Sequence, residues 1–244
     1  MLTAAGFILA TFPRCARLKT VRTVTVSASR NYHIHIAPGL LSLIGEQTRA
    51  LFPKAKTAAI ITDSNVRKLY LEPVMQSLSE AGLAPISYAI PPGEASKNAE
   101  QYLALLDWLC QNCMTRSGLI IALGGGVVGD LAGFTAATYL RGIPLVHVPT
   151  TLLAMVDSSV GGKTGIDLRA GKNLAGAFYQ PSLVLCDTST LDTLPDHVFK
   201  DGLAEVVKYG MIGSLCIDGN PHSPHTMTLS PRPYSLINNS YCLP

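Results

Sequence analysis

One short segment constrains the fold more than any other: an apolar run that ends in three glycines. Residues 118–123 read GLIIAL and lead directly into Gly124, Gly125 and Gly126, which open a helical pattern over 127–140. A run without polar positions is typical of a strand buried on both faces, as in a parallel sheet covered by helices. Glycines at this point let backbone N–H groups approach a phosphate at the helix N-terminus. The segment therefore predicts an α/β fold with a ligand site beyond the carboxyl ends of its strands.

The rest of the chain repeats this alternation of short apolar runs and helical patterns. The expected strands cover 57–61, 86–90, 118–123, 144–148 and 183–187, and the expected helices cover 66–81, 98–112, 127–140, 151–157 and 196–212. Alternating elements of this kind predict a mostly parallel, Rossmann-like sheet with helices on both faces.

Three further local patterns complete this expectation. Residues 23–36 alternate apolar and polar positions on both sides of a polar turn, which indicates a hairpin. The helix over 98–112 places Leu103, Leu106 and Leu109 on one side. Residues 158–182 are rich in glycine and polar residues, and we expect loops there.

Composition excludes several classes of function. A chain of 244 residues that is 48% hydrophobic and 14% charged is not disordered. A net charge of +3 without a basic block gives no reason to expect nucleic acid as a partner. The apolar run 4–12 is too short to span a bilayer, so no membrane partner is expected. Six dispersed cysteines do not form a disulfide framework, which favours a reducing compartment and a cytoplasmic location.

Lysines and a carboxylate beside glycines carry the chemistry of the second half. Lys163 follows two glycines and Lys172 follows one, which suits an anionic ligand such as a phosphate, although solvated surface lysines are the alternative. Asp130 lies one turn into the helix after the glycines, where it favours the helix dipole or binds a ribose hydroxyl. Glu205, with Lys208 three residues later, is either a metal ligand or half of an exposed ion pair.

A threonine pair, Thr150 and Thr151, joins the strand over 144–148 to the next helix. N-capping of that helix explains these threonines as well as ligand binding does.

Four motifs together resemble 3-dehydroquinate synthases: GGGVVGDLAGF, VPTTLLAMVDSSVGGKTGID, GKNLAGAFYQP and GLAEVVKYG. The resemblance runs from about Thr20 to Gly213. It implies an N-terminal NAD-binding α/β domain and a C-terminal helical domain, with NAD and a divalent metal, zinc or cobalt, as cofactors. The implied reaction converts 3-deoxy-D-arabino-heptulosonate 7-phosphate to 3-dehydroquinate and phosphate in the shikimate pathway of aromatic amino acid biosynthesis. NAD oxidises a substrate hydroxyl, phosphate leaves by β-elimination and the hydride returns.

The resemblance also assigns roles to particular residues. For NAD it implies Asp63, Glu94, Lys97, Gly125, Gly126, Asp130, Thr150, Thr151, Lys163, Lys172, Thr190 and Thr193. For the phosphorylated sugar acid and catalysis it implies Arg141, Asp157, Lys163, Lys172, Asn173 and Lys208. Glu205 matches the first metal ligand.

The resemblance predicts a division of the chain at three positions. We expect an extension over 1–18, the NAD-binding domain over 19–175, only the start of the helical metal-binding domain over 176–213, and an unrelated, disordered tail over 214–244. His222 and His225 in that tail do not match the family's two histidine ligands. The metal site is therefore expected to be incomplete and the chain inactive, whereas the full-length enzyme forms a homodimer.

Two other functions fit the same motifs. One is a related sugar-phosphate cyclase that makes an aminocyclitol precursor, and the other is a nucleotide-binding module that binds NAD without catalysis. Phosphate release separates the second function from the enzymatic ones.

Overall fold

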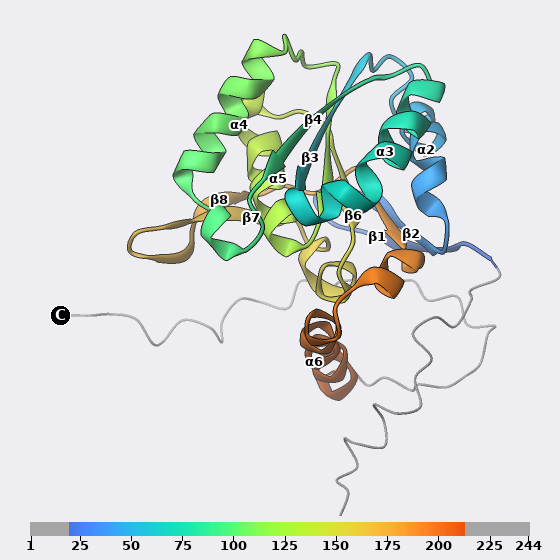
Figure 1. Cartoon of the computed structure of the whole chain (residues 1–244), viewed down its shortest axis with the longest axis vertical. Helices are drawn as coiled ribbons and strands as arrows, with labels where there is room; N and C mark the ends of the chain where they lie inside the picture. Colours follow the sequence, from blue (N-terminus) through green and yellow to red (C-terminus); the bar gives the residue numbers. More distant parts are fainter. Residues whose placement is uncertain (1–19, 213–244) are drawn as a thin grey trace, which may run out of the picture.

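A seven-stranded sheet covered by helices on both faces dominates the computed structural model, which describes residues 20–212 (Figure 1). Across the sheet the strands run in the order β1 (Arg22–Val26), β2 (Tyr32–Ala37), β9 (Leu183–Asp187), β6 (Leu145–Pro149), β5 (Leu119–Gly124), β3 (Thr57–Asp63) and β4 (Ala84–Ile90). Only the β1–β2 hairpin is antiparallel, and the other neighbours are parallel. This arrangement confirms the predicted Rossmann-like class.

Adjacent residues of the central strands pack into different layers, which explains the unbroken apolar runs. Ile60 of β3 packs with α3 (Ser64–Glu80), and Ile61 packs with α4 (Ala99–Gln111) on the opposite face. Both side chains are 0% exposed, and full burial of an isoleucine contributes about 2 to 3 kcal/mol. Helix α2 (Ile44–Leu51) shares the face of α3, and α5 (Gly126–Thr138) shares the face of α4.

The buried stripe of α4 differs from the expected one. Leu105 and Leu109 are fully buried, whereas Leu103 is 57% exposed. A helix turns about 100° per residue, so positions four apart lie closer to one line than the series 103, 106 and 109. The side of α4 that faces the sheet carries Leu105 and Leu109, so the expectation that Leu103 lies on the same side as Leu109 is wrong.

Residues 158–182 contain a second, two-stranded sheet where loops were expected. Strands β7 (Lys163–Leu168) and β8 (Gly171–Phe178) form an antiparallel hairpin. Glycines allow its close packing: a Cβ on Gly133 of α5 would lie 2.3 Å from Thr164 Cγ2, and one on Gly176 would lie 2.0 Å from the Thr164 carbonyl oxygen. Glycines such as these weaken the strand pattern in the sequence, and they also allow the hairpin to pack closely against α5.

The helix expected over 151–157 is present within one residue at each end, because residues 152–158 are helical. Its larger part, Ala154–Ser158, is a π-helical segment, η4. Such segments are rare and often lie at functional sites. Helix α6 (Asp196–Ile212) covers the predicted range and contacts η4.

The sheet continues beyond position 175, where the resemblance divides the chain. Strand β9 pairs with both β2 and β6 inside the sheet. We therefore propose that the NAD-binding domain ends after β9. The extension expected over 1–18 and the tail over 214–244 lie outside the described residues. Among residues 20–212, no helix combines the length and the apolar character needed to cross a membrane.

Candidate functional site

The candidate residues gather at one edge of the sheet. Parallel strands place their carboxyl ends together, and β3, β4, β5, β6 and β9 are parallel. The residues that follow these strands are Asp63 after β3, Glu94 and Lys97 after β4, Gly125, Gly126 and Asp130 after β5, Thr150 and Thr151 after β6, and Thr190 and Thr193 after β9. The chain runs from β3 to β4 and then returns to β5 on the other side of β3. The strand order reverses there, and α/β proteins bind ligands at such points.

The glycine turn after β5 has the features of a phosphate cradle. Gly125 is the N-cap of α5 and supplies no side-chain hydrogen bond to the first helical N–H groups. The turn is tightly packed, because a Cβ on Gly125 would lie 3.2 Å from Thr151 Cγ2 and one on Gly126 would lie 3.1 Å from Ser158 Oγ. Uncapped N–H groups at the start of a helix of this length attract a negative charge.

The two threonines after β6 differ in what their hydroxyl groups contact. Thr151 Oγ1 accepts a 3.2 Å hydrogen bond from the Ala154 N–H, as the N-capping alternative predicts. Thr150 is 3% exposed, and its Oγ1 has no hydrogen-bond partner among the described residues. An orphaned buried hydroxyl costs about 1 to 3 kcal/mol unless something binds it. Thr150 and the uncapped turn therefore fit the pyrophosphate of a dinucleotide.

Three further cofactor candidates have partners within the protein. Asp63 caps α3 by accepting from the N–H groups of Asn65 and Val66 at 2.8 and 3.1 Å. Thr190 Oγ1 donates to the Asp187 carbonyl at 2.8 Å, and Thr193 Oγ1 contacts the hydroxyl of Tyr70. These contacts stabilise the edge of the sheet, and NAD contacts by Asp63, Thr190 and Thr193 stay predictions.

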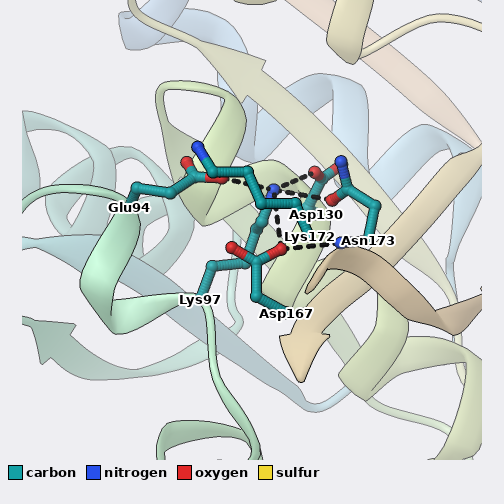
Figure 2. Close-up of polar contacts among 6 residues, drawn as sticks. All are labelled: Glu94, Lys97, Asp130, Asp167, Lys172 and Asn173. Carbon is teal, nitrogen blue, oxygen red and sulfur yellow. Dashed lines mark hydrogen bonds and ion pairs between the residues drawn. The ribbon is translucent and has the colours of Figure 1, made fainter. Parts of the chain in front are cut away.

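Lys97 is the centre of a buried ionic cluster (Figure 2). Its side chain is 5% exposed, and its Nζ lies 3.0 Å from Glu94, 3.3 Å from Asp130 and 3.7 Å from Asp167. It also donates a 2.7 Å hydrogen bond to Asn173 Oδ1. Burial lowers the pKa of Lys97, but the hydrogen bond to Glu94 and the charges of Asp130 and Glu94 outweigh burial and raise it. Burial raises the pKa of Asp130, and Lys97 opposes that shift.

An open pocket of about 460 Å³ lies beside this cluster. Four of the predicted residues line it together: Asp130 from α5, Asp157 from η4, Lys163 from β7 and Asn173 from β8. Ser158, Thr164 and Phe178 also line the pocket and were not among the candidates. Phe178 is 78% exposed, so its ring is available to cover an apolar part of a ligand.

Helix α6 brings a second group of predicted residues to the same side. Lys208 forms an ion pair with Glu205, as the structural alternative for these two residues predicts. Tyr209 donates a 2.6 Å hydrogen bond to Asp157 Oδ1 in the pocket wall. Glu205 has no metal-binding companions here, because residues 20–212 contain no group of three histidines, cysteines or carboxylates able to hold an ion.

Three of the residues predicted for the substrate do not line the pocket: Arg141, Lys172 and Lys208. Arg141 is exposed and follows the C-terminal end of α5. Lys172 is 72% exposed and lies 3.6 Å from Glu94 at the rim of the ionic cluster (Figure 2). Substrate contacts by these three residues stay predictions.

Sequence reasoning missed two polar residues of this region. Asp167 contacts both Lys97 and the Asn173 N–H, and Tyr209 contacts Asp157. Asp167 was hidden by the loop expected over 158–182. Tyr209 was part of the GLAEVVKYG motif, and its spacing of seven residues from Gly202 places the two on one face of α6.

Known proteins of one family match most of this chain. The model of the 3-dehydroquinate synthase N-terminal family matches residues 87–201. The 3-dehydroquinate synthase of Cereibacter sphaeroides is 51% identical over 195 residues, which are 80% of this chain and 52% of that protein. The enzyme of Symbiobacterium thermophilum is 52% identical over 181 residues, 74% of this chain and 51% of that protein. The chain thus spans about half the length of the curated relatives it matches.

Solved structures show the same architecture. A 2-deoxy-scyllo-inosose synthase complexed with carbaglucose-6-phosphate, NAD+ and Co2+ has a TM-score of 0.71 and 30% identity, over 78% of this chain and 50% of that one. A 2-epi-5-epi-valiolone synthase from Streptomyces hygroscopicus with NAD+ and Zn2+ bound has a TM-score of 0.65 and 32% identity, over 75% of this chain and 50% of that one.

Fold and glycine turn together define a Rossmann-like α/β domain of the kind that sugar-phosphate cyclases contain. Within that class, the sequence matches one family much more closely. The chain belongs to the 3-dehydroquinate synthase family.

Proposed function

We propose that residues 20–212 form the NAD+-binding part of a 3-dehydroquinate synthase and contribute one wall of its substrate pocket. The observation that carries the proposal is the uncapped glycine turn at Gly125 beside the orphaned Oγ1 of Thr150, at the point where the strand order reverses. NAD+ and a divalent metal, zinc or cobalt, are the cofactors we propose for the whole enzyme. NAD+, when bound, supplies a temporary acceptor for a substrate hydride.

The residues in and near the pocket suit a phosphorylated sugar acid. Lys163 in the lining, and Lys172 at the rim of the neighbouring ionic cluster, supply positive charge for phosphate and carboxylate groups. Asp157 and Asn173 offer oxygen and nitrogen atoms to sugar hydroxyls, and Lys208 extends the charge along α6. Arg141 stays a proposed substrate ligand that does not line this pocket. A homodimer is our proposal for the full-length enzyme.

The metal does not fit the described residues on their own. Glu205 is our proposal for one ligand, but a catalytic zinc site needs about three protein ligands, and no such group lies within 20–212. We therefore assign no chemical step to a metal here.

The substrate we propose is 3-deoxy-D-arabino-heptulosonate 7-phosphate, converted to 3-dehydroquinate and phosphate in the shikimate pathway. Identity supports it over the alternative cyclases, because the dehydroquinate synthases match at 51% and the aminocyclitol-type synthases at 30 to 32%. A module that binds NAD+ without catalysis is the second candidate. It is favoured because Glu205 does not belong to any group of three possible metal ligands among the described residues.

Titration of the 244-residue chain with NAD+ by calorimetry tests the proposal. The sharpest variant is Gly125→Asp, because Gly125 already has the extended backbone of an N-cap, at φ −79°. An aspartate there caps α5 and repels a pyrophosphate at once. We expect binding at least about tenfold weaker, equivalent to about 1.4 kcal/mol. The melting temperature, measured alongside, shows whether the 3.2 Å approach of the new Cβ to Thr151 Cγ2 disturbs the fold.

The outcomes separate the candidates. If the unaltered chain does not bind NAD+, or if Gly125→Asp binds it equally well, the proposed cofactor site is wrong. If NAD+ binds, phosphate release from 3-deoxy-D-arabino-heptulosonate 7-phosphate is measured with zinc or cobalt added. Release identifies a synthase, and binding without release identifies an NAD+-binding module.

A further inference from the structure

Asp167 lies where the β7–β8 hairpin departs from regular pairing. Ile166 pairs with Ala175 and Leu168 pairs with Gly171, so extra residues of β8 bulge out opposite Asp167. Asn173 lies in that bulge with a left-handed backbone, at φ 57°. Bulges beside ligand sites often redirect a side chain, and here the redirected side chain is that of Asn173, which lines the pocket.

Asp167 ties three segments together through its backbone and its carboxylate (Figure 2). Its N–H donates a 2.8 Å hydrogen bond to the Lys97 carbonyl, which fastens the end of β7 to the loop after β4. Its Oδ1 accepts a 2.7 Å hydrogen bond from the Asn173 N–H. The same Oδ1 lies 3.7 Å from Lys97 Nζ.

We infer that Asp167 is a positioning residue for the pocket: its Oδ1 fixes the left-handed turn at Asn173 and thereby aims the Asn173 side chain at Lys97 and the ligand. The inference rests on the proposed NAD+ site, because Asn173 Oδ1 accepts a 2.7 Å hydrogen bond from Lys97, one of the residues that the family resemblance implies for NAD. Asp167 itself does not line the pocket and acts through Asn173 and Lys97.

Distances decide which contact of Asp167 matters most. The hydrogen bond to the Asn173 N–H is short, whereas the ion pair with Lys97 at 3.7 Å is long. Lys97 also keeps Glu94 and Asp130 as partners without Asp167. The acceptor atom is therefore essential and the charge is not. Asparagine, which keeps an oxygen at that position, should replace aspartate, whereas alanine should not.

The experiment compares Asp167→Asn and Asp167→Ala by NAD+ calorimetry and by hydrogen–deuterium exchange of residues 171–176. We expect Asp167→Ala to bind NAD+ about tenfold less tightly, equivalent to about 1.4 kcal/mol, and to exchange these amides faster. Asp167→Asn should stay within about threefold of the unaltered chain. Asp107→Ala removes an exposed carboxylate from α4 and is the matched control.

A double variant distinguishes positioning from general stability. Asn173→Gly removes the side chain but keeps the left-handed backbone accessible. If Asp167 acts by placing that side chain, then Asp167→Ala weakens NAD+ binding little further in the Asn173→Gly background. Independent, additive losses in NAD+ affinity overturn the inference.

Two other results also overturn it. One is an Asp167→Asn variant as impaired as Asp167→Ala, because charge would then be decisive. The other is unchanged exchange over 171–176 in Asp167→Ala. If the unaltered chain does not bind NAD+, the proposed function fails by itself, and the exchange comparison still decides the role of Asp167.

Discussion

The Tyr209 hydroxyl in α6 donates a 2.6 Å hydrogen bond to Asp157 Oδ1 in η4, two residues that are 52 positions apart in the chain. Gly202 permits this contact, because α6 packs at that glycine against the side chain of Leu152 and the backbone nitrogen of Leu153. The hydrogen bond with Asp157 is the main cause that raises the pKa of Tyr209 to about 12, and burial and nearby carboxylates add to it. The Tyr209 hydroxyl thus connects α6, which lies outside the sheet, to Asp157 in the wall of the pocket.

Tyr209→Phe should lower the free energy of unfolding by about 0.5 to 1 kcal/mol, the value of one partly exposed hydrogen bond. Urea denaturation measures the loss. The pKa of Tyr209 is higher in the folded chain than the usual value of 10, so its contribution is complete below pH 10 and is lost as the pH rises towards 12. Tyr88→Phe is the control, since the Tyr88 hydroxyl has no hydrogen bond within the described residues. Equal losses in both variants would contradict the assignment.

Gly202→Ala should push α6 away from η4. A Cβ at this position would lie 2.7 Å from the Leu153 backbone nitrogen and 2.7 Å from Leu152 Cβ. Overpacking of this kind costs about 1 to 3 kcal/mol, even though alanine favours helix by about 1 kcal/mol. In a Tyr209→Phe background the cost of Gly202→Ala should be smaller, because the hydrogen bond that the shift breaks is already absent. Chemical denaturation of the four chains tests this, and full additivity would argue against a shift of α6.

Lys97→Met should be strongly destabilising, by about 3 kcal/mol, because it leaves Glu94, Asp130 and Asp167 without their buried counter-charge. Lys172→Met is a matched control. It removes a cation that pairs with the same Glu94, but from a side chain that is 72% exposed, and should cost less than about 1 kcal/mol. Unpaired buried carboxylates bind protons more readily when folded, so the Lys97→Met penalty should shrink as the pH falls. Thermal melts between about pH 4 and 8 check both trends.

His147 should make the fold sensitive to mild acid. It is 4% exposed behind the first turns of α5, and burial lowers its pKa from 6.5 to about 4. The unfolded chain therefore takes up a proton before the folded chain does, and stability is lost as the pH falls from 6.5 towards 4. The loss reaches at most about 3 kcal/mol. In His147→Gln this part of the pH dependence should disappear, as measured by urea unfolding at pH 8, 6 and 4.5. An unchanged slope would show that other groups cause it.

Burial on both faces made the sheet predictable from sequence. Runs such as those of β3 and β5 have no polar positions, since each residue meets a helix on one face or the other. The glycine turn was predictable for a similar reason: a buried strand, glycines and a helix leave few conformations. Contacts between distant segments were harder to predict, because the periodicity of a sequence indicates local secondary structure but does not indicate which distant residue a side chain contacts.

Asp167 and Leu103 illustrate the limit. Strand β7, which carries Asp167, is exposed at both ends and buried at three consecutive positions, and it pairs with a glycine-containing strand. Its sequence therefore lacks the alternation by which a strand is recognised. Leu103 has the right spacing for a buried stripe, but the position of the sheet decides which stripe is buried. Arg141 has a motif match but does not line this pocket, and its role in substrate binding stays a prediction.

The place of β9 in the sheet has a consequence for synthesis. During translation β1 and β2 emerge before the other described strands, but the strand that β2 pairs with in parallel is β9, the last strand within residues 20–212. Until β9 emerges, the inner edge of β2 offers unpaired N–H and C=O groups to any extended segment nearby. Synthesis of more than 140 residues thus separates this strand edge from its partner, and an unpaired edge of this kind favours aggregation.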